Sequence, residues 1–65
     1  MFPNLEAEMA RNGHTNTLTA VKLGVSRQAF ENKKKTGLFK LDEIRKLLNL
    51  YGQSFEYLFA TQNTA

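Results

Sequence analysis

The sequence predicts an all-α fold, a compact bundle of about five short helices. Apolar residues recur at three- and four-residue intervals, and residues that begin or end helices separate these stretches. No segment sustains the strict apolar–polar alternation of a half-buried strand. At 65 residues the chain corresponds to one domain, which we expect to span residues 1–60, with a flexible polar tail at 61–65.

The first expected helix covers residues 3–12. A proline suits its first position, because the N–H that proline lacks would have no partner there. Phe2, Leu5 and Met9 follow one another at helical spacing and predict a single buried face. Gly13 then supplies a residue that readily takes the left-handed conformation at a helix end.

The second and third expected helices cover residues 16–23 and 27–34. Thr15 and Ser26 precede them and are typical N-cap residues, because a hydroxyl oxygen can accept a hydrogen bond from the first turn. Gly24 ends the second helix and leaves a connection of only three residues before the third.

The fourth and fifth expected helices cover residues 41–51 and 55–59. Ser54 is the expected cap of the last helix. Apolar residues at helical spacing indicate the face of the fourth helix that packs inward: Leu41, Ile44, Leu47, Leu48 and Tyr51. The residues expected in the core are large and apolar: Leu5, Met9, Leu23, Phe30, Ile44, Leu47, Leu48 and Leu58.

Composition argues against several classes of protein. The chain has no cysteine, so neither a disulfide framework nor a thiolate metal site is expected. His14 is a lone histidine, and we expect no metal site and no cofactor. No pairing of nucleophile, base and acid suggests an enzyme, and no small-molecule substrate is expected. Without a signal-peptide pattern or a long apolar run, no membrane association is expected and the expected location is the cytoplasm.

Positive charge is concentrated in the middle of the chain. The net charge is +3, and the stretch from Lys22 to Lys40 holds six basic residues against one acid, Glu31. A local basic stripe is typical of a surface that binds phosphates, although it is also compatible with an ordinary solvated face.

Residues 16–35 form the motif on which the functional prediction depends. A three-residue connection forces two helices to cross steeply, which defines a helix-turn-helix unit. Gly24 permits the sharp turn, Val25 can pack between the helices, and Ser26 starts the next helix. Ala20 is small where the two helices would touch.

Residues 20–28 (AVKLGVSRQ) resemble the helix-turn-helix signature of the Cro and lambda-type phage repressor family. Residues 39–44 (FKLDEI) resemble the start of the fourth helix in small repressors of Gram-positive phages and prophages. Residues 51–59 (YGQSFEYLF) and 4–13 (NLEAEMARNG) are similar to the family's fifth and first helices. Nearly the whole chain is thus similar to a lambda-repressor-like domain, either as a compact Cro-like protein or as part of a longer repressor.

The resemblance implies sequence-specific binding to double-stranded DNA, with the second helix of the motif in the major groove. Arginine suits guanine, and glutamine and asparagine suit adenine, because each pair can form two hydrogen bonds. The side chains expected to contact bases are Ser26, Arg27, Gln28, Glu31 and Asn32. Arg27 and Glu31 are also spaced to pair on one helix face, so Glu31 either accepts a bond from cytosine or orients Arg27.

Basic and amide side chains around the motif are expected to bind phosphates, which fix the register without reading sequence. These are Asn16, Lys33, Lys34, Lys35 and Lys40. Asn16 occupies the position where the family commonly has a glutamine that binds a phosphate beside a helix N-terminus.

A homodimer on a palindromic operator is the expected working form, because two-fold symmetry doubles the contact with DNA. Aromatic residues crowd the C-terminal part of the chain, and not all of them can be buried in so small a domain. The expected dimer contacts are Leu50, Tyr51, Phe55, Tyr57 and Phe59. The alternative function is a protein-interaction or dimerisation module, antitoxin-like, that uses the same fold.

Overall fold

The computed structural model describes residues 1–61, and this range contains five helices and no strand. They are α1 (Pro3–Arg11), α2 (Asn16–Leu23), α3 (Arg27–Thr36), α4 (Leu41–Tyr51) and α5 (Phe55–Leu58). The predicted all-α class is therefore confirmed. Residues 62–65, most of the predicted tail, lie outside the described range. None of the described helices is both long and apolar enough to cross a membrane.

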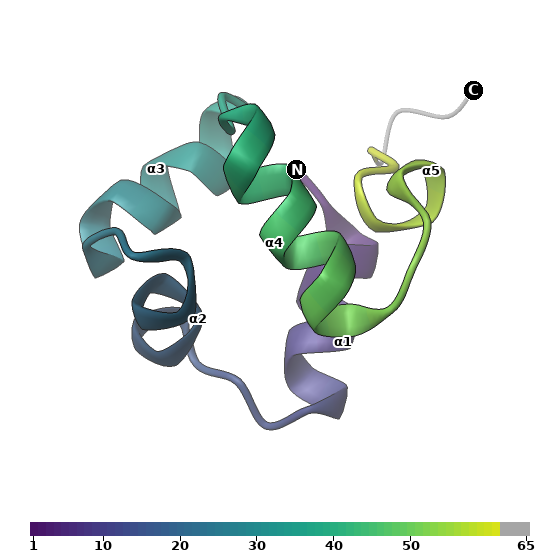
Figure 1. Ribbon diagram of the computed structural model, residues 1–65, viewed down its shortest axis with the longest axis horizontal. Coiled ribbons are helices and arrows are strands. Elements are labelled where there is room, and N and C mark those ends of the chain that lie inside the picture. Colours follow the sequence, from purple (N-terminus) through teal and green to yellow (C-terminus); the bar gives the residue numbers. More distant parts are fainter. Residues whose placement is uncertain (62–65) are drawn as a thin grey trace.

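Figure 1 shows α2 and α3 together on one side of the molecule, with α4 between this pair and α5. The helix α1 runs behind α4 and contacts α5, so the two ends of the described chain lie near each other in the fold. The helix-turn-helix pair therefore forms one side of the molecule, and the other three helices support it.

The predicted caps form at three helix starts. The hydroxyls of Thr15, Ser26 and Ser54 each accept a hydrogen bond from the backbone N–H three residues later, at 3.1, 3.1 and 3.2 Å. Each of these bonds satisfies an N–H that has no partner within the helix. Capping residues thus set the start of α2, α3 and α5, as the sequence predicts.

Helix ends differ slightly from the predicted ones. The helix α3 continues two residues beyond the predicted Lys34, to Thr36, whose hydroxyl donates back to the carbonyl of Asn32 at 2.9 Å. Gly37, at φ 77°, then ends the helix in the left-handed conformation. The helices α1 and α5 each end one residue earlier than predicted.

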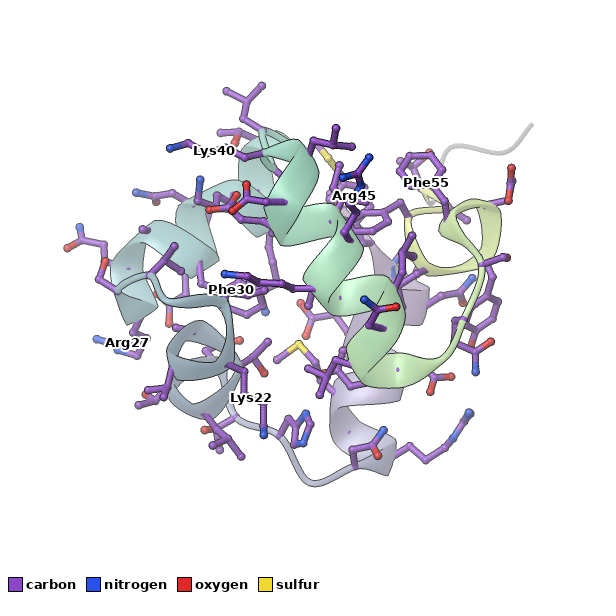
Figure 2. The ribbon with its side chains drawn as sticks, in the orientation of Figure 1. Lys22, Arg27, Phe30, Lys40, Arg45 and Phe55 are labelled. Carbon is purple, nitrogen blue, oxygen red and sulfur yellow. The ribbon has the colours of Figure 1, made fainter. Side chains whose placement is uncertain are left out.

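The core lies where the five helices meet. Figure 2 shows Phe30 pointing from α3 toward the centre of the molecule, where it is fully buried. Phe39 packs between two other aromatic residues: its ring centre lies 6.3 Å from that of Phe30 and 5.6 Å from that of Phe59. The buried apolar residues are Phe2, Leu5, Met9, Ala20, Leu23, Phe30, Leu47, Tyr51 and Leu58.

The helix α4 is rotated relative to the sequence prediction. Ile44 and Leu48 are half-buried rather than core residues, and Leu41 is 63% exposed. Glu43 is buried in their place, on the same face as the core residue Leu47. The apolar stripe of α4 therefore straddles the edge of the core and reaches the surface.

Candidate nucleic-acid interface

A three-residue turn joins α2 to α3. Gly24 ends α2 at φ 78°, and its N–H donates to the carbonyl of Val21 while that of Val25 donates to the carbonyl of Ala20. Val25 is half-buried and packs against the core, and Ser26 caps α3. Ala20 is 1% exposed, so the two helices approach closely over a small side chain. Figure 1 shows the two helices steeply inclined to each other, as the short connection requires.

The outward face of α3 carries polar side chains. Gln28 and Asn32 are exposed and lie one turn apart on this face. The side chain of Arg27 is 61% exposed and, in Figure 2, lies away from the core at the start of α3. Ser26 is also exposed, although its hydroxyl oxygen already accepts the capping bond. These predicted base-reading residues therefore share one accessible end of the motif.

Glu31 is tied to two helices. Its Oε2 accepts hydrogen bonds from Nη1 of Arg27 at 2.9 Å and from Nδ2 of Asn16 at 3.2 Å. The Arg27–Glu31 pair predicted from the spacing is therefore present. The bond from Asn16 crosses from α2 to α3, and the sequence carries no signal for it because the two residues are fifteen positions apart.

Lys34, predicted to contact phosphate, is turned inward and is occupied by partners within the protein. Its side chain is 12% exposed, and Nζ lies 2.7 Å from both Glu6 Oε2 and Asn16 Oδ1. Nζ also lies 5.1 Å from the centre of the Phe30 ring, which favours a cation there. This ammonium group therefore links α1, α2 and α3.

Lys33, also predicted to contact phosphate, is paired with a carboxylate from α4. Its Nζ lies 3.2 Å from Oε1 of the buried Glu43, and the lysine side chain is 18% exposed. The same Glu43 oxygen accepts a hydrogen bond from the backbone N–H of Lys40 at 2.8 Å. Burial of Glu43 requires a partner for its charge, and Lys33 supplies it.

Lys35 and Lys40 are exposed, and both stand near the C-terminal end of α3. These two remain available as phosphate contacts. Lys22, at the end of α2, is exposed too and adds to the positive charge around the motif. The sequence places Lys22 in the basic stripe but not among the site residues.

Tyr51, predicted both on the inward face of the fourth helix and at a dimer contact, is buried within the protein. Its hydroxyl lies 2.8 Å from Nδ1 of His14, and 8% of the residue is exposed. Burial, together with the nearby charge of Glu8, raises the pKa of the Tyr51 hydroxyl. The hydroxyl of Tyr57 donates to Glu8 at 2.9 Å, and this hydrogen bond is the main cause of a raised pKa for Tyr57.

Exposed and half-buried apolar residues also occur on α4 and around α5. Phe55 is 49% exposed and stacks on the half-buried Phe59, with ring centres 5.2 Å apart. Leu50 and Tyr57, also predicted at a dimer contact, are half-buried. We define the α4–α5 surface as the exposed residues Leu41 and Phe55 together with the half-buried Ile44, Leu48 and Phe59.

Comparison of the chain with protein-family models, with curated proteins and with solved structures finds no match.

Proposed function

We propose that this protein is a sequence-specific double-stranded DNA-binding protein that regulates transcription, similar in action to a phage or prophage repressor. The observation that carries the proposal is the outward face of α3. Arg27, Gln28 and Asn32 project from it, while Phe30 anchors the opposite face in the core. A helix held in this way can enter the major groove, where its first turns meet base edges.

The exposed side chains of α3 match the chemistry of base edges. Arg27 can donate two hydrogen bonds to O6 and N7 of guanine, and the amides of Gln28 and Asn32 can each pair with N6 and N7 of adenine. Ser26, at the start of the helix, keeps its hydroxyl hydrogen for a base or a phosphate oxygen. The proposal therefore assigns base reading to the N-terminal two turns of α3.

Phosphate binding is assigned to Lys35 and Lys40, which are exposed at the other end of α3. Because Lys33 and Lys34 are held by carboxylates, fewer cations take part than the sequence predicts. A small number of phosphate contacts means a shallow dependence of affinity on salt.

We also propose that two copies associate through the α4–α5 surface. Exposed apolar residues on a domain this small favour a partner. Phe55, which is 49% exposed, has the largest side chain among them. A Phe55→Lys variant should sediment as a monomer at a concentration where the parent chain is a dimer. A parent chain that remains monomeric at high concentration, with and without DNA, would remove the dimer from the proposal.

Exposed apolar residues on α2 favour a second candidate, a protein-interaction module with the same fold. Leu18 is 41% exposed and Val21 70%, and both lie on the outer face of the helix. A protein partner covering these residues would bury apolar surface beside the motif. Under this alternative the polar face of α3 has no role in reading bases.

The test that separates the two candidates is selection from a random duplex library. DNA binding predicts an enriched palindrome with half-sites about one helical turn apart. On the enriched duplex, Arg27→Ala should cost about 1–3 kcal/mol and relax base preference at one position in each half-site. If no sequence is enriched, or if Arg27→Ala binds all duplexes as the parent does, the interaction module is the better reading.

A further inference from the structure

We propose that Asn16 and Glu31 are positioning residues that hold Arg27 for base reading, and that Lys34 anchors this arrangement to α1. The inference rests on the proposed function, because it concerns how the reading side chain is held. It replaces the predicted roles of Asn16 as a phosphate contact and of Glu31 as a base contact.

Four short polar contacts form a continuous chain from α1 to the start of α3. Glu6 Oε2 accepts from Nζ of Lys34 at 2.7 Å, and the same ammonium donates to Oδ1 of Asn16 at 2.7 Å. Nδ2 of Asn16 then donates to Glu31 Oε2 at 3.2 Å, and this oxygen accepts from Arg27 Nη1 at 2.9 Å. The guanidinium of Arg27 is thereby connected to three helices.

The two ends of the Asn16 amide have separate tasks. Its carbonyl oxygen faces the ammonium of Lys34, and its amide nitrogen faces the carboxylate of Glu31. This polarity fixes which way the amide points, because the reverse orientation would place the amide hydrogens against the ammonium group. The oriented amide nitrogen then holds the carboxylate of Glu31 in one favoured position.

Glu31 is suited to orient Arg27 because it is partly shielded from solvent. Its side chain is 33% exposed, whereas that of Arg27 is 61% exposed. Arginine loses much rotamer freedom when it is immobilised on a base, and a partner that restricts it beforehand reduces this loss. Since one guanidinium nitrogen contacts Glu31, other guanidinium donors remain for a guanine.

Lys34→Met distinguishes positioning from phosphate binding. Methionine keeps an apolar stem beside Phe30 and removes the ammonium group. Positioning predicts that preference for the base opposite Arg27 falls about threefold, as expected when one long side chain loses its restraint. The slope of affinity against salt should stay unchanged. A slope reduced by about one with unchanged base preference is the signature of a lost phosphate contact and would overturn the inference.

Asn16→Ala combined with Arg27→Ala tests whether the two residues act together. Asn16→Ala alone should reduce the base preference about threefold. In the Arg27→Ala background it should have no further effect on that preference, because no arginine is left to position. Thr17→Ala, an exposed neighbour on the same turn, is the matched control and should keep the parent preference in both backgrounds.

The measurement is competition between the enriched duplex and duplexes altered at one position, for each variant whose thermal melt shows it folded. If Arg27→Ala relaxes the preference but Asn16→Ala and Lys34→Met keep it in full, the positioning inference is overturned and the proposed function stands. If Arg27→Ala itself leaves the preference unchanged, the proposed function is overturned together with the inference. Additive effects of Asn16→Ala and Arg27→Ala would equally contradict positioning.

Discussion

Replacing Glu43 with alanine removes two contacts at the start of α4 at once. Its carboxylate accepts the backbone N–H of Lys40 and pairs with the ammonium of Lys33. Loss of a capping interaction costs about 1 kcal/mol. Leaving a partly buried cation without its partner costs roughly 1–3 kcal/mol, at the lower end here because Lys33 keeps some access to solvent. We therefore expect Glu43→Ala to lower the free energy of unfolding by about 2–3 kcal/mol.

A loss of this size is large for a 65-residue domain, whose total stability is roughly 3–10 kcal/mol. Urea unfolding followed by circular dichroism at 222 nm measures it, and the midpoint should fall by about 1–2 M. Glu43→Gln is the matched variant, because its amide oxygen can still accept the N–H of Lys40. It should lose about half as much stability as Glu43→Ala.

Lys33→Met and Glu43→Gln together form a double-mutant cycle that isolates the ion pair. In the Glu43→Gln background Lys33→Met should be nearly neutral, since the ion pair is already absent. The reasoning is refuted if Glu43→Ala changes the free energy of unfolding by less than about 0.5 kcal/mol, the range of an ordinary surface substitution.

Further predictions address the turn, the cations and the buried tyrosine. Gly24→Ala should lower stability by about 1 kcal/mol in thermal melts, because φ is +78° although a Cβ would meet no neighbour; an unchanged melting temperature would contradict this. Lys40→Ala should reduce the salt dependence of DNA affinity by about one unit, whereas Lys33→Met should leave it unchanged; equal slopes for the two variants would show that they are misassigned. The pKa of the Tyr51 hydroxyl is raised in the fold, so its neutral form contributes to the free energy of unfolding. This contribution is fully present below about pH 10 and is lost as pH rises through the folded pKa. Urea midpoints should therefore decline above about pH 10, less steeply for Tyr51→Phe; an identical decline in both chains would contradict the assignment.

Local signals predict the helices well. Thr15, Ser26 and Ser54 cap helices where the sequence predicts, because a cap depends on a few adjacent residues. The burial of Phe30 is likewise predicted correctly, since its place on the helix that follows a short turn puts it on the inward face. These features depend on contacts within or between adjacent segments.

Side-chain partners distant in sequence are where prediction from sequence fails. Lys33 and Lys34 stand in a basic run that is typical of a phosphate-binding surface, yet each is held by a carboxylate from another helix. The rotation of α4 has the same origin, because burial of Glu43 depends on Lys33. For Tyr51 the helical spacing and the expected dimer contact gave different predictions, and the fold buries the residue with its hydroxyl beside His14.

The central claim is that Arg27, at the start of α3, reads a base in the major groove. Methylation of guanine N7 tests this directly, because N7 lies in that groove and is one of the two acceptors for arginine. On the enriched duplex, methylation of one guanine in each half-site should block binding by the parent chain. The same methylation should have little effect on the residual binding of Arg27→Ala. Binding by the parent that is insensitive to every methylated guanine, or equal sensitivity in both chains, would contradict the claim.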